Sequence, residues 1–180
     1  MKHSIFLSYP QPFTQNQVDF IKEIKTYLEG IGFEPRTLGV TDYDMTTPLV
    51  AIRRLMLESN GLLTVAFRRS HIEKGSSKPN SDINKESIDL SDRWITSPYC
   101  HIEPAMAFQI GLPILVLREE GVIADGILER GATATYLPEF DLNKPVKEYL
   151  DSEEWKQLIR EWEWYVRSVV KNKGCPPKLY

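Results

Sequence analysis

The chain has 180 residues, of which 42% are hydrophobic and 26% charged, and these values are typical of one globular domain with a sizeable core. Its formal net charge of −3 argues against binding to nucleic acid, which requires clustered lysine and arginine. No apolar run approaches the roughly 18 residues of a membrane span, and the N-terminus lacks a signal-peptide core, so we expect a cytoplasmic protein with no membrane partner.

The first third of the chain predicts a strand, a helix and a second strand. The apolar run Ser4–Tyr9 is cut off by proline, as at the end of a buried strand. Apolar residues then recur at helical spacing from a Thr14 cap to the glycine at position 30. The weaker strand segment 32–38 contains Pro35, which favours an edge position in a sheet.

The middle of the chain adds a helix and two strongly apolar strands. Thr47 is placed to cap a helix that has Pro48 in its first turn. Segments 61–67 and 112–117 are near-continuous apolar runs, and such runs separated by amphipathic helices are typical of parallel strands covered on both faces. The expected fold class is α/β, a flavodoxin-like three-layer domain with a central, mostly parallel sheet of about five strands flanked by helices.

The C-terminal third predicts the last elements of a single domain that spans residues 1–172. Segment 133–137 (TATYL) is the expected last strand. A closing helix lies within residues 145–172, with a break near Asp151, and residues 173–180 form a frayed tail.

Residues 71–92 are polar and have no sustained periodicity, which predicts a long loop. Loops of this length in compact domains are often functional. This one immediately precedes the helix that carries Glu103.

The two cysteines, Cys100 and Cys175, lie far apart and outside any Cys-x-x-Cys or Cys/His cluster. We therefore expect no disulfide framework and no metal site. Cys100 has no identifiable partner that would activate it, which favours a small buried residue over a nucleophile.

In an open α/β sheet, ligands bind beyond the carboxyl ends of the strands. Segments 8–12, 39–47, 67–70 and 118–125 should therefore converge on one crevice, bordered by the start of the Glu103 helix. The polar and aromatic side chains available there are Ser8, Tyr9, Asp42, Asp44, Arg68, Arg69, Ser97, Tyr99, Glu103 and Glu119.

The stretch TSPYCHIEPAMA places an aromatic ring beside a carboxylate. Ser97 followed by Pro98 predicts a helix start, and Tyr99 and Glu103 are then one turn apart on the same face. Such a pair suits a ligand with a flat heterocycle and a sugar, because the ring stacks while the carboxylate stabilises positive charge at the sugar carbon. Cleavage of a glycosidic bond is the chemistry this pair favours.

The same residues have a purely structural interpretation. Glu103 can be favoured by the helix dipole alone, with Tyr99 as a core residue. Arg68 and Arg69 follow a strand and could hold phosphates, but paired arginines are more often solvated.

Three segments, in this order, resemble the TIR (Toll/interleukin-1 receptor) domain. SIFLSY is similar to the first-strand motif, and TPLVAIRRLMLESNGLLTVAF is similar to the second helix and third strand. SPYCHIEPAMAFQIGLPILVL resembles the Ser-x-Trp-Cys-x-x-Glu segment and the fourth strand. The resemblance spans Ser4 to Leu117, with Tyr99 in place of the usual tryptophan.

Pro104 follows the glutamate where the family commonly has an aliphatic residue. Proline removes a backbone donor, so we expect the helix either to kink or to restart near this position. The 71–92 loop is also longer than in compact members of the family.

The resemblance implies that the chain cleaves the nicotinamide–ribose bond of NAD+, which is then the substrate, with no cofactor. Glu103 would be the catalytic glutamate, and the 42–47 loop would gate the site and mediate assembly. The residues that we expect to bind substrate are Ser8, Tyr9, Pro10, Asp44, Arg68, Arg69, Ser97 and Tyr99.

The leading hypothesis is a TIR-type NAD+ nucleosidase, a glycohydrolase or ADP-ribosyl cyclase, that makes an ADP-ribose-derived signal in bacterial antiphage immunity. A homo-oligomer and a separately encoded effector are the expected partners, because no effector domain is recognisable in the chain. One alternative is a nucleoside 2-deoxyribosyltransferase-like enzyme. The other is a non-catalytic TIR adaptor that acts by self-association.

Overall fold

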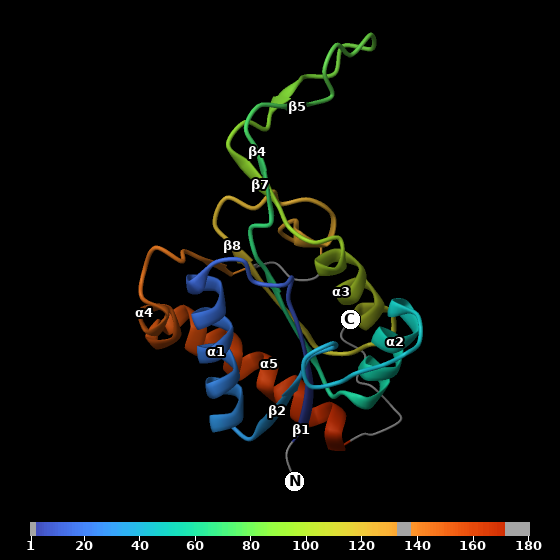
Figure 1. Ribbon diagram of the computed structural model, residues 1–180, viewed down its shortest axis with the longest axis vertical. Coiled ribbons are helices and arrows are strands. Elements are labelled where there is room, and N and C mark those ends of the chain that lie inside the picture. Colours follow the sequence, from blue (N-terminus) through green and yellow to red (C-terminus); the bar gives the residue numbers. More distant parts are fainter. Residues whose placement is uncertain (1–2, 133–137, 172–180) are drawn as a thin grey trace.

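The computed structural model describes residues 3–132 and 138–171, and at its centre lies a five-stranded sheet (Figure 1). Its strands, in spatial order, are β2 (Phe33–Arg36), β1 (His3–Ser8), β3 (Leu62–Ala66), β8 (Ile114–Glu119) and β9 (Glu139–Phe140). Every neighbouring pair is parallel. The predicted three-layer α/β class is confirmed, and the strand order is the doubly wound one of flavodoxin-like folds.

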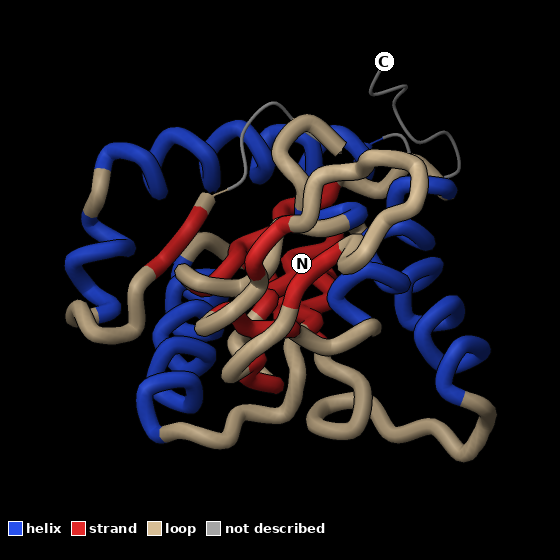
Figure 2. Tube along the Cα trace, turned by 90° about the horizontal axis from the view of Figure 1, so that it is seen from above, coloured by secondary structure: helices blue, strands red, loops and turns tan. Residues whose placement is uncertain are grey.

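Helices cover both faces of the sheet (Figure 2). The helices on one face are α1 (Gln15–Gly30), α4 (Val146–Asp151) and α5 (Glu153–Lys171). Those on the other face are α2 (Pro48–Glu58) and α3 (Tyr99–Gln109). Ser152 separates α4 from α5, one residue after the position where the sequence predicts a break.

Aromatic side chains join the strands to the helices of the first face. Phe20 of α1 stacks on Phe140 of β9, with ring centroids 4.2 Å apart. Trp162 of α5 meets Phe33 of β2 edge-on at 5.8 Å. Because β2 and β9 are the two outer strands of the sheet, these contacts hold both of its edges against one helical layer.

The two edges of the sheet test two predictions from the sequence. Pro35 lies in β2, which is an edge strand as predicted, and its missing N–H leaves no donor for a further strand. At the opposite edge, the expected strand 133–137 and the tail 173–180 lie outside the described residues. The fifth strand that the structure shows is β9, immediately after that segment. No helix in the described ranges is long and apolar enough to cross a membrane.

The helix α3 continues through Pro104 to Gln109, so the predicted restart near Pro104 is wrong. The proline ring is buried, and it costs the helix one main-chain donor. Hydrogen bonds at both ends secure the helix, from Cys100 N to Ser97 O at 2.9 Å and from Leu112 N to Ala107 O at 3.0 Å. Glu103 is therefore held at a fixed position along one continuous helix.

The segment 71–92, predicted as a long polar loop, also contains short strands. β4 (Ser70–Ile72) pairs antiparallel with β7 (Arg93–Ile95), and β5 (Ser76–Ser77) pairs with β6 (Ile88–Asp89). Together they form a two-stranded arm that points away from the body (Figure 1). Each strand has only two or three residues, too few for an alternating pattern in the sequence. These strands are therefore recognisable only from the backbone pairing in the structure.

Trp94 anchors the arm at its base. The Arg68 guanidinium lies over the Trp94 ring, 5.8 Å from its centroid. Main-chain hydrogen bonds also join Trp94 N to Gly121 O at 3.0 Å and Ile123 N to Trp94 O at 2.8 Å. Beyond this anchor, none of the side chains of residues 73–92 is buried.

Replacing residues 73–92 with Asn-Gly should leave the body of the protein folded and nearly as stable as before. Ile72 and Arg93 face each other in the antiparallel ladder, and Asn-Gly suits a two-residue hairpin turn. We expect the midpoint of thermal unfolding to change by less than about 4 °C, equivalent to less than about 2 kcal/mol. Phe20→Ala, the control, should destabilise by about 3–5 kcal/mol because it empties a core position. A comparable loss in the armless protein would contradict the expectation.

Candidate functional site

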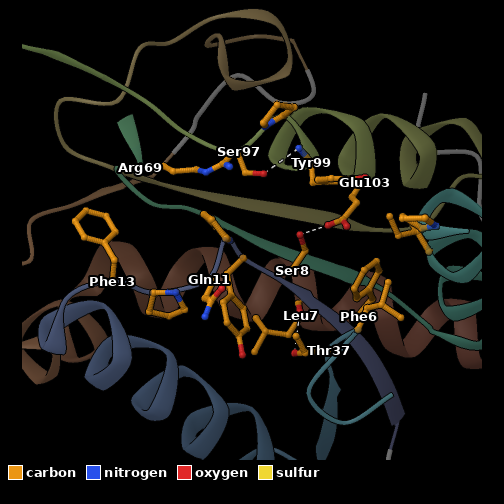
Figure 3. Close-up of a pocket in the computed structure, with 17 residues that line it drawn as sticks. Phe6, Leu7, Ser8, Gln11, Phe13, Thr37, Arg69, Ser97, Tyr99 and Glu103 are labelled. Atoms are coloured by element: carbon orange, nitrogen blue, oxygen red, sulfur yellow. Dashed lines mark hydrogen bonds between the residues drawn. The ribbon is translucent and has the colours of Figure 1, made fainter. Parts of the chain in front are cut away.

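The carboxyl ends of β1 and β2 and the start of α3 enclose a cleft of about 820 Å³. Figure 3 shows Tyr99 and Glu103 projecting from α3, with Ser8 of β1 and Thr37, which follows β2, on the opposite side. The residues named from the sequence that line this cleft are Ser8, Tyr9, Pro10, Arg69, Ser97, Tyr99 and Glu103.

Glu103 is a buried carboxylate at the floor of the cleft. Only 7% of the residue is exposed, and its Oε2 accepts a hydrogen bond from the hydroxyl of Ser8, which is itself buried. Burial raises the pKa of Glu103 to about 7, although the Ser8 hydrogen bond lowers it. Near neutral pH the carboxyl is therefore present both as the carboxylate and as the acid.

A second buried glutamate, Glu119, is held quite differently. It accepts a hydrogen bond from the backbone N–H of Arg68 at 2.8 Å and one from Gln17 Nε2 at 3.4 Å, and Arg68 Nε lies 3.6 Å away. Burial raises its pKa, and these donors act in the opposite direction. Glu119 does not line the cleft, and its hydrogen bonds connect the ends of neighbouring strands. Glu103, by contrast, lines the cleft and can accept further hydrogen bonds from a ligand there.

The Tyr99 ring is available to a ligand. Tyr99 is 40% exposed and lines the cleft, which contradicts its interpretation as a core residue. Pro98 occupies the cap position of α3, one residue later than the sequence predicts, and Ser97 Oγ accepts a hydrogen bond from Tyr99 N at 3.3 Å. This hydrogen bond ties the first residue of the helix to the cleft wall.

The two adjacent arginines have different surroundings. Arg68 Nε donates to the carbonyl of Glu120 at 2.6 Å, and its guanidinium also lies over Trp94, outside the cleft. Arg69 lines the cleft beside Ser97 (Figure 3), and its side chain forms no ion pair with any part of the chain that the structure describes. Of the pair, Arg69 is the one that can meet a ligand.

The structure places Asp42 and Asp44 outside the lining of the cleft. Asp42 accepts a hydrogen bond from Arg36 Nε at 3.1 Å, and Asp44 forms an ion pair with Arg54 at 2.9 Å. Both carboxylates therefore fasten the 39–47 loop to neighbouring elements. The 118–125 segment, expected to join the crevice, does not line it either.

Several lining residues escaped the sequence analysis. Thr37 and Leu38 directly follow β2, so the rule that ligands bind beyond strand ends would have found them. Thr37 Oγ1 donates to Leu7 O at 2.9 Å, which joins the ends of β2 and β1. Gln11, Pro12 and Pro98 lie in segments that the sequence places at the crevice, although they were not named singly. The others have no signal in the sequence, and they are Phe6, Leu7, Phe13, Pro48 and Ile52.

Cys100 lies beside the site but is not a nucleophile at neutral pH. It is 1% exposed, and burial raises the pKa of its thiol to about 12. Within residues 3–132 and 138–171, no group of three or more His, Cys, Asp or Glu side chains could hold a metal ion.

Glu103→Gln should stabilise the fold above pH 7. The folded state raises the pKa from its ordinary value of 4.5 to about 7, so it binds the proton more tightly than the unfolded chain does. The wild type therefore loses stability as pH rises from about 4.5 to about 7, by about 3 kcal/mol in all. Urea unfolding at pH 5 and pH 8 measures this loss, which Glu103→Gln should lack and the exposed control Glu120→Gln should retain. Equal losses of stability in all three proteins would rule out a raised pKa of Glu103 as the cause.

Comparisons with known proteins concern the fold. No protein-family profile and no curated protein sequence matches the chain. Among solved structures, the CMP N-glycosidase BcmB of Clostridium botulinum is 19% identical, with 88% of this chain and 98% of that chain covered and a TM-score of 0.49. The TIR domains of the activated Roq1 resistosome, which directly recognises the pathogen effector XopQ, are 14% identical, with 96% and 86% covered and a TM-score of 0.42. These values assign neither a family nor a reaction.

Proposed function

We propose that this protein cleaves the N-glycosidic bond between a ribose and a nitrogen heterocycle, with NAD+ as its substrate. One observation carries the proposal: the buried carboxylate of Glu103 has a single hydrogen-bond donor among the described residues, and it faces a cleft beside the exposed ring of Tyr99. A carboxylate is costly to bury without a full set of donors. A ligand with sugar hydroxyls would supply the missing donors.

The proposed chemistry follows from the charge of the leaving group. In NAD+ the C1′–N1 bond breaks with its electron pair moving to the pyridinium nitrogen, which releases neutral nicotinamide and needs no general acid. The positive charge that develops on the ribose is stabilised by ionised Glu103. Water then adds to C1′ and loses a proton, which gives ADP-ribose, and attack by an adenine nitrogen of the same molecule would give a cyclic product instead. Tyr99 would stack on the nicotinamide.

The raised pKa of Glu103 favours one alternative. A neutral nucleobase leaves only when it is protonated, and the acid form of Glu103 could donate that proton. The alternative is therefore a nucleoside N-glycosidase or 2-deoxyribosyltransferase-like enzyme. A non-catalytic adaptor, by contrast, would not depend on Glu103 at all.

The biological setting is the part of the proposal that rests on the TIR resemblance of the three sequence segments. In that setting the product is an ADP-ribose-derived signal in bacterial antiphage immunity, read by a separately encoded effector. Self-association of the chain and a cytoplasmic location belong to the same proposal.

Purified protein incubated with NAD+ should release nicotinamide, followed by mass spectrometry. Glu103→Gln should lower the rate at least about 100-fold, because it removes the charge opposite the developing cation. The matched control, Glu120→Gln, changes an exposed side chain outside the cleft and should retain the wild-type rate. Intact NAD+ alongside cleaved deoxynucleosides would support the alternative and refute NAD+ as the substrate.

The pH profile separates the two chemistries. If ionised Glu103 is the active form, kcat/KM for NAD+ should rise with pH and level off above about pH 7, the pKa of the free enzyme's carboxyl. Ser8→Ala removes the hydrogen bond that lowers this pKa, so the midpoint should move to higher pH, while Ser97→Ala should leave it in place. A rate that falls as pH rises through 7 would show that the acid form of Glu103 acts.

A further inference from the structure

A second cavity of about 780 Å³ adjoins the cleft that contains Glu103. The residues that line both cavities are Tyr9, Gln11, Pro12, Thr37 and Leu38. The two cavities are therefore neighbours, and we name them the Glu103 lobe and the α1 lobe after the elements that distinguish them.

The charges of the two lobes differ. Lys22 and Lys25, both on α1, are the charged residues that line the α1 lobe, and no carboxylate of the described residues lines it. Neither ammonium forms an ion pair within residues 3–132 and 138–171. Asp19, an acidic neighbour on the same helix, accepts a hydrogen bond from Gln15 at 2.9 Å and lies outside the lobe. The α1 lobe is therefore positively charged and uncompensated.

Lys25 stands where the two lobes meet. Its Nζ lies 5.7 Å from the centroid of the Tyr9 ring, and Tyr9 lines both lobes. The preceding residue, Ser8, donates its hydroxyl hydrogen bond to Glu103. Two adjacent residues of the chain thus border the glutamate on one side and the ammonium on the other.

We propose that the α1 lobe is a phosphate subsite, in which Lys22 and Lys25 bind the 5′-phosphate of a nucleotide whose ribose lies against Glu103. The N-glycosidic bond is at C1′ and the 5′-phosphate is carried through C4′, on the other side of the ring oxygen, so a nucleotide with its ribose against Glu103 would extend its phosphate towards the α1 lobe. Lysine ammonium groups bind phosphate as point charges. The proposal rests on the proposed N-glycosidic cleavage, and it requires of the substrate the 5′-phosphate that NAD+ carries and nucleosides lack.

Arg69 is the competing cation, and it lies on the other side of the site. It lines the Glu103 lobe beside Ser97, on the side of Tyr99, which would stack on the heterocycle (Figure 3). A phosphate held by Arg69 would lie on the heterocycle side of the ribose. The two lysines are therefore better placed for the 5′-phosphate.

Binding of nicotinamide mononucleotide and of nicotinamide riboside to the Glu103→Gln protein, measured by calorimetry, tests the subsite without turnover. The mononucleotide should bind at least about tenfold more tightly, as expected for charge-assisted hydrogen bonds. Adding Lys22→Ala and Lys25→Ala together should abolish the preference. Adding Lys147→Ala, an exposed lysine of α4 outside both lobes, should preserve it.

Equal affinity for the two ligands, or no binding of either, would overturn the subsite, and so would a preference that survives the loss of both lysines. A preference lost only on adding Arg69→Ala would overturn it as well. Ribose 5-phosphate and ribose carry no N-glycosidic bond, so their comparison isolates the subsite from the reaction. A preference for ribose 5-phosphate that depends on the lysines, in a protein that leaves NAD+ intact, would refute the proposed function while supporting the phosphate subsite.

Discussion

The hydrogen bond from Ser8 to Glu103 joins the end of a central strand to the middle of a helix, and the cleft takes its position from that junction. The other elements of the cleft surround this hydrogen bond. The strand β2 ends alongside β1, the first residue of α3 lies at the rim, and α1 borders the adjoining lobe. A carboxylate buried with one donor is unfavourable for folding. The molecule tolerates it because the carboxyl can keep its proton, and a ligand able to donate hydrogen bonds would relieve the cost. Glu119, buried to a similar degree, shows the alternative of saturating a carboxylate within the fold.

The parts of the fold that sequence patterns predict are those whose burial is dictated locally. A strand covered on both faces needs an uninterrupted apolar run, so the sequence alone identifies β1, β3 and β8 as buried strands. Pro35 has no N–H to donate to a neighbouring strand, so this single residue is enough to predict that β2 is an edge strand. Since the ends of parallel strands meet at one edge of a sheet, the order of elements along the chain is enough to predict that Ser8, Tyr99 and Glu103 lie together.

The features that the sequence does not predict depend on contacts between distant segments. Arg68 and Arg69 are identical in type and adjacent, and only the position of Trp94 and the Glu120 carbonyl decides which of them is engaged. In the sequence, Lys22 and Lys25 look like any solvated face of a helix, and only the fold shows that they line one cavity with the segment after β1. The strands of the arm are too short to have a period, and Pro104 fails to end α3 because hydrogen bonds on either side secure the helix.

The arm has a consequence for how this protein can change over generations. Residues 73–92 bury no side chain, so their composition is not constrained by the packing that fixes the sheet and its helices. Insertions, deletions and substitutions there can accumulate without altering the cleft, as long as Trp94 keeps its place at the base. The surface of the arm can therefore evolve independently of the cleft. Related chains can diverge in the arm while they retain the same glutamate.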